Sequence, residues 1–411
     1  MKIGIEVQRL FRANKFGIEV SALELIKKLR EIEPRHQYVV FAKDDEDRGC
    51  LTPSDNLEIK IVSGGLFADF EQFFLPIAAA REQVDVLHCT GNTAPYFSRV
   101  PVIQTLHDVI FMDAIPGNDT FYQRFGNRYR RSMVPLVTPR SKAIITVSEH
   151  EKGRILERLT IDPNRVHVVY NGIDAKRFHP SGDAERTRFV RAKYRLPEHY
   201  ILFLGNTSVR KNAAGVLEAY ARYAAASDAA LPLVTPGLPE KFITDKLREL
   251  DIAFNKNQFI TPGYIDDADL PLVYGLSTMF LFPSLSEGFG MPVLEAMASA
   301  TPVITSSISS MPEIAGDAAI LVDPLKPEDI CGALLMLSGN DALRKKKIAE
   351  GMTNVKRFSW ERTAEQVLSL YEAVYLQNRA VPTTPGLLHR PYVAKNYKDL
   401  QGRVRAFKSR P

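Results

Sequence analysis

The stretch TMFLFPSLSEGFGMPVLEAMASATPVIT, residues 278–305, contains a complete strand–loop–helix–strand unit. Four of the five residues of TMFLF are apolar, so both faces of this strand are apolar, as in a strand that helices cover on both sides. Pro292 suits the first turn of a helix, and the helical stretch runs over 291–299 before PVIT begins a second strand. Such a unit, joined by short loops, predicts a parallel sheet with helices packed against it.

The same alternation extends over most of the chain. The expected strands are KIGIEV, QYVVFA, LEIKIV, DVLH, PVIQTL, AIITV and VHVVY in the first half, and YILFL, ALPLV, QFIT, TMFLF, TPVIT and AAILV in the second. Expected helices cover 18–33, 67–82, 120–137, 149–158, 211–226, 239–250, 291–299, 326–337, 341–356 and 360–377. The fold class is therefore α/β, with two doubly wound, Rossmann-like domains and a ligand site in the cleft between them.

Glycine and proline interrupt the alternation once, in NGIDAKRFHPSGD at 171–183, which is typical of an interdomain linker. We place an N-terminal domain at 1–175, a C-terminal domain at 176–360, a last helix at 361–378 and a tail at 379–411. The tail carries eight basic residues and one acidic residue, whereas the whole chain has a formal charge of only +5. The remainder of the chain is therefore close to neutral.

Composition excludes several classes of protein. Of the 411 residues, 45% are hydrophobic and 25% are charged, which is ordinary for a globular protein. The three cysteines are far apart, which argues against a disulfide framework or a zinc knuckle and fits a reducing compartment. MKIGIEV is a strand pattern rather than a signal peptide, and no apolar run reaches the roughly 18 residues of a membrane span.

The loop between TMFLF and the next helix has the composition of a phosphate site. Gly288 and Gly290 allow close approach of the backbone, and the amides at the helix start near Met291 favour an anion. Glu287 in the loop and Glu295 inside the helix can each accept hydroxyl hydrogen bonds. This pattern suits a nucleotide sugar, with one carboxylate for the sugar and one for the ribose; the alternative is a helix-start glutamate and a solvated one.

A second loop, in YILFLGNTSVRKN at 200–212, delivers adjacent cations to the end of a strand. Arg210 and Lys211 can neutralise a diphosphate, the arginine as a planar fork and the lysine as a point charge. The alternative is a basic pair on a solvated helix start. Because cations are unfavourable at a helix N-terminus, we favour a bound anion.

These two segments resemble the retaining glycosyltransferases of family 4, which have the GT-B fold. NGID at 171–174, GYI at 263–265, PVIT at 302–305 and MPEIAGDAAILVDP at 311–324 also match, and the resemblance extends to about residue 377. It implies a nucleotide-sugar donor held mainly by the second domain, and a last helix that returns to the first. The donor-binding residues that it implies are Gly17, Gly205, Asn206, Arg210, Lys211, Tyr264, Ile265, Glu287, Gly288, Phe289, Gly290, Met291, Pro292 and Glu295.

Within that set the resemblance gives individual roles. Arg210 and Lys211 meet the diphosphate, Glu287 the donor sugar and Glu295 the ribose. Backbone from Gly288 to Met291 contacts sugar and phosphate, and Tyr264 and Ile265 flank the base. Near the first strand the family usually has a glycine pair, whereas this chain has only Gly17.

In the first domain, His107 in TLHDVIF at 105–111 follows a strand. A single histidine there is commonly structural, but the family has a histidine of this motif at the donor sugar. The catalytic set is therefore His107, Glu287, Arg210 and Lys211, with Asp108 as an orienting or turn-capping residue. Ser148 and Glu151 have the spacing of a capping box.

No metal or cofactor is expected. Asp267-Ala-Asp269 and Asp45-Glu-Asp47 resemble the metal-binding Asp-x-Asp of other transferases, but we interpret the first as a helix cap and the second as part of a polar loop. Arg210, Lys211 and a helix N-terminus can stabilise the leaving diphosphate without metal.

The chain is similar to bacterial mannosyltransferases of O-antigen and other surface polysaccharides. We therefore expect GDP-mannose as donor, with UDP-glucose or dTDP-rhamnose as alternatives, and a glycan or lipid-linked acceptor. The expected location is cytoplasmic, on the inner face of the plasma membrane.

The stretch 120–137 bears on that location. On a helix, Arg124, Arg128 and Arg131 would lie beside Phe121, Phe125 and Tyr129, and a basic face next to an aromatic one suits anionic lipid or a lipid-pyrophosphate acceptor. The alternative is a solvated face over a core stripe.

Two alternative functions would each require a motif of their own. A nucleotide-sugar epimerase or dehydrogenase would carry GxGxxG after the first strand, where this chain has QRLFRANKFG. A nucleic-acid-binding protein would carry a recognition module, and none is visible, so nucleic acid is not expected as a partner.

Overall fold

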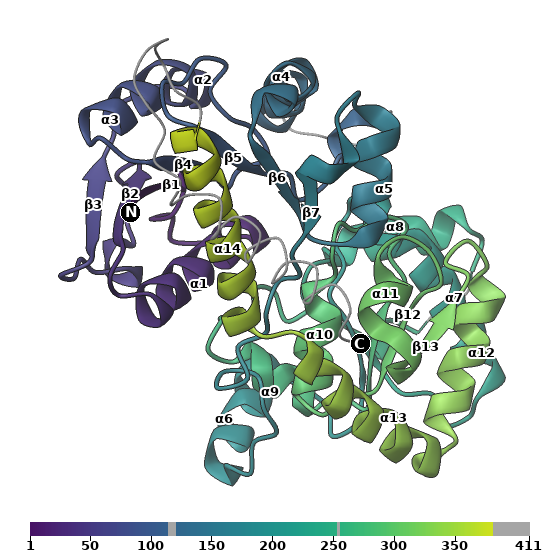
Figure 1. Ribbon diagram of the computed structural model, residues 1–411. Coiled ribbons are helices and arrows are strands. Elements are labelled where there is room, and N and C mark those ends of the chain that lie inside the picture. Colours follow the sequence, from purple (N-terminus) through teal and green to yellow (C-terminus); the bar gives the residue numbers. More distant parts are fainter. Residues whose placement is uncertain (114–120, 253–254, 381–411) are drawn as a thin grey trace, which may run out of the picture.

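The computed structural model describes residues 1–113, 121–252 and 255–380. From residue 381 on, the basic tail expected at 379–411 lies outside the described residues. The described chain forms two parallel sheets, each with helices on both faces, so the expected α/β class and GT-B architecture are confirmed (Figure 1).

The first sheet has seven strands in the order β3-β2-β1-β4-β5-β6-β7, and all neighbours are parallel. The strands are β1 (Lys2–Glu6), β2 (Gln37–Ala42), β3 (Leu57–Ile61), β4 (Val86–Cys89), β5 (Val102–Thr105), β6 (Ala143–Thr146) and β7 (Val166–Val168). Each strand lies where an apolar run predicted one. Because the strands are parallel, all their carboxyl ends lie at one edge of the sheet.

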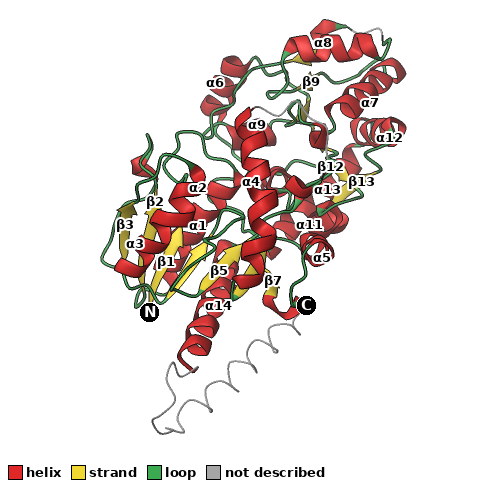
Figure 2. Ribbon diagram, turned by 90° about the horizontal axis from the view of Figure 1, so that it is seen from above, coloured by secondary structure: helices red, strands yellow, loops and turns green. Residues whose placement is uncertain are grey.

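Two groups of helices cover this sheet. α1 (Gly17–Ile32) and α14 (Trp360–Ala380) pack together on one face, and their apolar residues share a core with β1, β2 and β4. On the other face lie α2 (Phe67–Asp69), α3 (Leu75–Arg81), α4 (Phe121–Val137) and α5 (Glu149–Arg158). The last helix of the described residues, α14, therefore completes the first domain (Figures 1 and 2).

The second sheet has six parallel strands in the order β10-β9-β8-β11-β12-β13. They are β8 (Ile201–Phe203), β9 (Leu233–Val234), β10 (Phe259–Ile260), β11 (Met279–Phe282), β12 (Val303–Ser306) and β13 (Ala319–Val322). Alternate side chains of β11 enter different cores, Phe280 and Phe282 one and Met279 and Leu281 the other.

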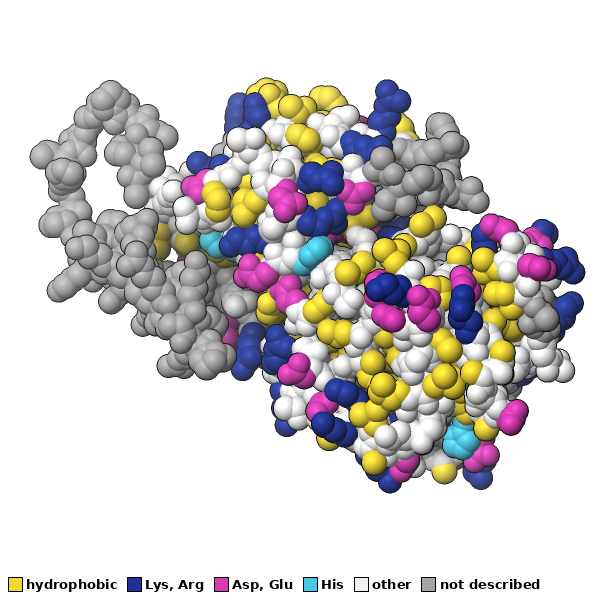
Figure 3. All heavy atoms as spheres, turned by 90° about the vertical axis from the view of Figure 1, so that its right-hand side faces the viewer, with side chains coloured by type: hydrophobic (Ala, Val, Ile, Leu, Met, Phe, Trp, Pro, Cys, Tyr) yellow, Lys and Arg dark blue, Asp and Glu magenta, His cyan; other side chains and the backbone are white. Residues whose placement is uncertain are grey.

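The helices of the second domain follow these two cores. α6 (Ala184–Tyr194), α9 (Leu270–Gly275), α10 (Met291–Ala298) and α11 (Met311–Ala315) contribute to one. α7 (Ala213–Ala226), α8 (Glu240–Glu249) and α12 (Pro327–Ser338) contribute to the other, while α13 (Asp341–Asn354) packs beside α10. On the face that bears β13 and α12, acidic and basic side chains are interspersed among apolar ones (Figure 3).

The helix expected over 67–82 is not continuous. It is divided into α2, a π-helical turn over Phe70–Phe74, and α3. Pro76 has no amide hydrogen and its ring would clash with the carbonyl of the preceding turn, so the widened turn, in which the Leu75 amide donates to the Phe70 carbonyl, accommodates it. Helix α6 was missed because only Val190 and Tyr194 of its eleven residues are buried, which leaves little apolar periodicity.

The chain crosses between the domains twice, and the two crossings lie side by side. The Ile173 amide donates to the Phe358 carbonyl at 3.3 Å, and the Thr363 hydroxyl donates to the Tyr170 carbonyl at 2.7 Å. A Cβ on Gly172 would lie 2.2 Å from the Trp360 nitrogen, so only glycine fits there. None of the described helices is long and apolar enough to span a membrane.

A buried histidine joins α14 to the first sheet. His88 on β4 lies 2.7 Å from the Tyr371 hydroxyl through Nδ1 and 2.7 Å from the Thr105 hydroxyl through Nε2. Burial, together with the nearby His107, lowers the pKa of His88 to about 3. The folded protein therefore holds this imidazole in its neutral form.

This predicts an acid-sensitive attachment of α14. Because the unfolded chain protonates His88 below about pH 6.5 and the folded chain does not, the folded state loses about 2 kcal/mol relative to the unfolded state between pH 7 and pH 5. Denaturant unfolding at both pH values measures the free energy of unfolding of the wild type and of His88→Gln. The difference between these two free energies should shrink as the pH falls. Tyr371→Phe is the control, because it removes a hydrogen bond without changing the titration. An equal pH dependence in wild type and His88→Gln would contradict the prediction.

Candidate active site

The loop between β11 and α10 is held by two serine side chains. The Glu287 amide donates to the Ser309 hydroxyl at 2.9 Å, and this hydroxyl donates back to the Glu287 carbonyl at 2.8 Å. The Ser310 hydroxyl contacts the Glu287 and Phe289 carbonyls, both at 2.9 Å. Ser309 has φ +63°, a conformation that costs a non-glycine residue free energy and is concentrated at functional sites. The run SSISS at 306–310 was the sequence signal for these residues, and it was missed.

Both glycines of the loop are required by close contacts. Gly290 has φ +111°, and a Cβ there would lie 2.4 Å from the Met311 side chain. A Cβ on Gly288 would lie 2.7 Å from the His107 carbonyl oxygen, which belongs to the first domain. The loop therefore meets the other domain directly, and α10 begins at the residue after Gly290.

The two expected cations converge on Glu287. They lie on a short 3₁₀ turn, Val209–Lys211, that follows β8. Arg210 Nη1 is 2.8 Å from Glu287 Oε2, and Lys211 Nζ is 2.6 Å from Glu287 Oε1. The backbone of Asn212, the next residue, has φ +57°. The side chain of Asn212 donates to the Pro283 and Pro324 carbonyls and so fixes the turn. The two cations predicted to meet a diphosphate and the glutamate predicted to meet the donor sugar thus form one cluster, which we call the cation cluster.

Burial and charge act in opposite directions within this cluster. Burial opposes ionisation of Glu287, but the charges of Lys211 and Arg210 outweigh it and lower the pKa of the carboxyl group. Burial lowers the pKa of Lys211, and Glu287 offsets only part of that effect. A buried lysine of lowered pKa needs an anion beside it to remain charged.

Glu295 has a different environment. Its carboxylate accepts a hydrogen bond from the Tyr274 hydroxyl at 2.9 Å, and burial raises its pKa. The positive charges of Arg177 and Lys211 act on the same carboxyl group. Glu295 therefore lies in the electrostatic reach of the cation cluster. Tyr274 and Arg177 were missed, because Tyr274 lies outside every motif and Arg177 lies in the interdomain linker, where no ligand contact was expected.

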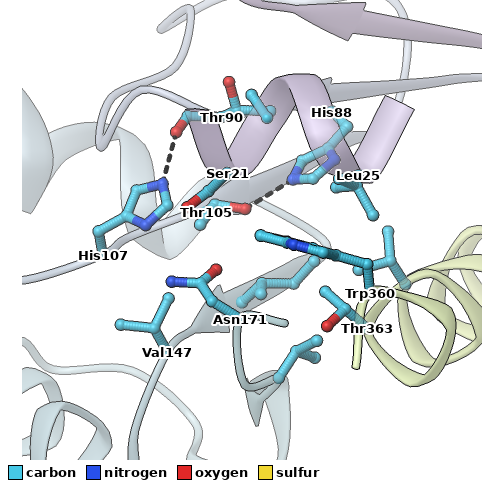
Figure 4. Close-up of a pocket in the computed structure, with 14 residues that line it drawn as sticks. Ser21, Leu25, His88, Thr90, Thr105, His107, Val147, Asn171, Trp360 and Thr363 are labelled. Atoms are coloured by element: carbon cyan, nitrogen blue, oxygen red, sulfur yellow. Dashed lines mark hydrogen bonds between the residues drawn. The ribbon is translucent and has the colours of Figure 1, made fainter. Parts of the chain in front are cut away.

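His107 lies opposite, at the carboxyl end of β5. Its Nε2 donates to the Thr90 carbonyl at 3.0 Å, and its amide donates to the Asn92 side chain at 2.6 Å (Figure 4). Burial lowers the pKa of His107, so the ring is neutral at pH 7. With Nε2 protonated, Nδ1 is the hydrogen-bond acceptor. The ring borders a cavity of about 30 Å³ between β4, α1 and the start of α14, which is large enough only for water.

Further contacts join the domains beside this site. The Ser148 hydroxyl accepts from the Glu151 amide and donates to the Gly288 carbonyl at 2.8 Å. The Glu313 carboxylate accepts from the Glu149 and His150 amides at the start of α5, at 2.7 and 3.1 Å. The helix start in one domain is thus capped by a carboxylate from the other.

The expected capping box is therefore only half present. Ser148 caps α5, but the Glu151 side chain accepts from the Val109 amide and from Arg154 instead of from Ser148. Burial raises the pKa of Glu151 to about 7. The contact of Ser148 with Gly288 also makes it part of the cleft.

Buried carboxylates at the first domain's cleft edge were missed from the sequence. Glu6 ends β1, and Glu71 lies in the π-helical turn. Glu71 accepts from the Tyr129 hydroxyl and the Gln72 side chain, each at 2.8 Å, and from Thr93. Burial raises the pKa of Glu6 to about 8 and that of Glu71 to about 6. Their isolated positions in the sequence gave no signal.

The remaining expected residues are not brought to the cation cluster by any contact. Gly17 begins α1 with open space around it, and the Gly205 Cα faces the Phe203 ring. The Asn206 side chain closes a local turn to the Ser208 amide. Tyr264 is exposed, whereas Ile265 is buried in the core of the second domain.

The basic face expected over 120–137 is only partly present in α4. Arg128 is exposed, but the Arg131 guanidinium donates to the Phe111 and Asp113 carbonyls. Tyr129 is half-buried and donates a hydrogen bond to Glu71, so this part of the aromatic stripe faces the first domain, while Phe125 is exposed. The Arg124 side chain lies outside the described residues.

Asp269 does not cap α9 with its side chain. Its carboxylate is buried and paired with Lys193 at 2.7 Å, with Arg186 and with the Tyr194 hydroxyl at 2.8 Å. This aspartate therefore fastens α6 to α9. Over residues 1–113, 121–252 and 255–380, no three His, Cys, Asp or Glu side chains are grouped as a metal site.

Comparison with known protein families now adds to the geometry. Residues 17–177 match the family model described as Glycosyltransferase Family 4, and residues 186–353 match the model of Glycosyl transferases group 1. The two models meet at the linker between the sheets and together span most of the chain.

The chain is a GT-B glycosyltransferase.

Relatives of this glycosyltransferase include O-antigen chain mannosyltransferase B of Escherichia coli, 29% identical over 66% of this chain and 70% of that protein. The MMP alpha-(1->4)-mannosyltransferase of Mycolicibacterium hassiacum is 27% identical over 72% of each chain. The serotype-specific mannosyltransferase WbdA of Escherichia coli is 28% identical over 59% of this chain but only 30% of its own length. The glycosyltransferase thus spans less than a third of WbdA.

Solved structures share the fold. HepE of Anabaena in complex with UDP and glucose superposes with a TM-score of 0.69 at 16% identity, covering 91% of this chain and all of HepE. Sucrose-phosphate synthase of Thermosynechococcus elongatus gives 0.69 at 18% identity, covering 92% and 99%. At these identities the likeness concerns the fold alone.

The cation cluster predicts that two similar substitutions lower the free energy of unfolding by different amounts. Glu287→Gln leaves Lys211 and Arg210 without their anion and should lower the free energy of unfolding by about 3 kcal/mol. Glu295→Gln is the matched control, because the amide oxygen can still accept from the Tyr274 hydroxyl and Glu295 has no ion pair among the described residues; this substitution should lower the free energy of unfolding by less than about 1 kcal/mol.

Denaturant unfolding of both variants near pH 7 measures this difference. The stabilisation from Glu287 is present above the ordinary carboxyl pKa of 4.5 and disappears as the pH falls through the lowered folded value. The gap between the two variants should therefore close in acid. Equal costs near pH 7 would contradict the charge argument.

Proposed function

We propose that this glycosyltransferase moves a mannosyl group from GDP-mannose to a hydroxyl of a glycan or lipid-linked acceptor, with retention at the anomeric carbon and without a metal. The observation that carries the proposal is the convergence of Arg210, Lys211 and Glu287 beside the N-terminus of α10. Mannosyltransferases of O-antigen synthesis among its relatives support the choice of sugar.

The leaving group explains why two cations lie at this position. A departing nucleoside diphosphate gains negative charge, which a planar guanidinium, an ammonium group and the free amides of a helix start can stabilise. Without donor, Glu287 is the counter-ion of both cations. A bound diphosphate would share that role, and the Glu287 carboxylate could then accept hydrogen bonds from sugar hydroxyls.

The other side of the sugar faces the first domain. His107 is neutral and presents Nδ1 as an acceptor, so it can orient a sugar hydroxyl without adding positive charge. Glu295, with its Tyr274 contact, suits the ribose hydroxyls. We propose same-face attack by the acceptor hydroxyl, whose proton passes to the leaving phosphate oxygen; no nucleophilic protein side chain is required.

Acceptor and location follow from the same hypothesis. A polysaccharide precursor carried on a lipid would be extended at the inner face of the plasma membrane. Glu6 and Glu71 lie buried at the cleft edge of the first domain, so an acceptor would meet the residues around them rather than these carboxylates themselves.

Transfer without metal can be tested directly. Release of GDP from GDP-mannose in the presence of an acceptor glycan should persist in EDTA. Lys211→Ala should lower kcat/KM by about 100-fold or more, because it removes a charge that stabilises the leaving group. Lys345→Ala on the exposed face of α13 is the matched control. Complete loss of activity in EDTA that manganese restores, or normal turnover in Lys211→Ala, would refute the proposal.

The donor can be identified by calorimetric titration with GDP, UDP and dTDP. We expect GDP to bind at least about tenfold more tightly than the other two, equivalent to about 1.4 kcal/mol. Preference for UDP or dTDP would instead favour UDP-glucose or dTDP-rhamnose as donor and would leave the glycosyl transfer itself standing.

A further inference from the structure

A second cavity lies on the first domain, at the opposite edge of the sheet from the cleft. Its volume is about 300 Å³, in the range of small-molecule sites, and residues 95–102, 137, 140–142 and 378 line it. His107 and Ser148 follow the carboxyl ends of β5 and β6, whereas Pro101 and Lys142 precede the amino ends of the same strands. We call this cavity the amino-edge pocket.

The amino-edge pocket contains three cations and, in the part of the chain that the structure describes, no acid. Arg99, Arg140 and Lys142 line it, and all three are exposed. Over the described residues, none of these side chains lies within ion-pair distance of a carboxylate. Other cations of the described residues do face an acid, as the Arg210 and Lys211 pairs with Glu287 illustrate. A local charge of about +3 therefore has no counter-ion among residues 1–113, 121–252 and 255–380.

The wall of the pocket is fixed before any ligand binds. The Arg140 guanidinium lies 4.0 Å from the centre of the Tyr96 ring and donates to the Tyr96 hydroxyl at 2.6 Å and to the Leu136 carbonyl at 2.8 Å. The Tyr96 amide donates to the Gln72 side chain at 2.9 Å. These contacts hold one arginine in place, while Arg99 and Lys142 keep their polar ends exposed.

A neighbouring arginine strengthens the positive field. Arg165 immediately precedes β7 and donates to the carbonyls of Pro139 and of Ser141, the second of which lines the pocket. Parallel strands place the residues before β6 and β7 at the same edge of the sheet, which brings Arg165 beside Lys142.

From this geometry we propose that the amino-edge pocket binds a phosphate group. A carboxylate ligand would neutralise only one of three cations, whereas a phosphate or diphosphate carries two or more negative charges. Arginine binds phosphate through two parallel hydrogen bonds, and lysine adds a point charge. The proposal does not depend on the transfer reaction, because the cleft and this pocket lie at opposite edges of the sheet.

Two sources could supply the phosphate, a lipid headgroup or a free phosphate compound. Phe97 is 78% exposed beside the pocket, and Leu136 is 48% exposed one turn before Arg140. Apolar side chains next to cations are typical of a surface that contacts the headgroup region of a membrane. The experiment therefore has one arm for each source.

The test uses the full-length chain carrying Lys211→Ala, so that the cleft binds diphosphate weakly. In the first arm, inorganic pyrophosphate is titrated by calorimetry; in the second, flotation compares phosphatidylglycerol with phosphatidylcholine vesicles. Arg99→Ala combined with Lys142→Ala should weaken binding by about tenfold in at least one arm. Arg188→Ala, an exposed cation on α6, is the matched control and should change neither.

The arms separate the outcomes. Loss of pyrophosphate binding supports the pocket as a site for a free phosphate compound, and loss of phosphatidylglycerol binding alone supports a lipid headgroup. Unchanged binding in both arms overturns the proposal. Because the substituted side chains are exposed, thermal unfolding should match the parent, and Lys142→Glu, which reverses the charge, should weaken binding more than Lys142→Ala does.

Discussion

A parallel sheet must be covered on both faces, and the first sheet of this glycosyltransferase obtains part of its cover from the far end of the chain. α1 alone does not cover the face formed by β1, β2 and β4; α14 completes it with Ala364, Val367, Tyr371 and Val374. The second domain is therefore inserted between the first domain and its own last helix. The position of the cleft follows, because the chain has to leave and re-enter the first domain at one place.

The chemistry of the site depends on the same parallel geometry. The carboxyl ends of β8 and β11 bring two separate loops together, so cations from one loop meet a carboxylate from the other. Glu287 then has two roles that do not conflict: it keeps Lys211 charged in a buried place, and it marks the location where another anion is favoured. The amino-edge pocket has cations of similar kind without such a carboxylate.

The strands could be predicted from the sequence because strands that are covered on both faces are short continuous runs of apolar residues. It also placed Arg210, Lys211 and Glu287 in the loops that follow two such runs, and the fold brings these three side chains together; their roles toward a donor are predictions. It failed where a role depends on a partner distant in the chain. Glu151 has capping-box spacing but bonds Val109, and Asp269 precedes a helix but pairs with Lys193. Tyr274 and Glu313 act on residues that only the fold brings near. The break in the 67–82 helix arose from Pro76, which widens the turn before it. A pattern of apolar residues carries no information about that effect.

The paired crossings at 170–173 and 358–363 have a mechanical consequence. The two crossing segments are hydrogen-bonded to each other and therefore define one axis. Rotation of one domain about this axis is the motion that stretches neither segment. Displacement then grows with distance from the axis, as it does along a lever. Ser148, Gly288 and Glu313, which join the domains beside the donor loop, would separate on opening, whereas Tyr170 and Thr363 would keep their contact throughout.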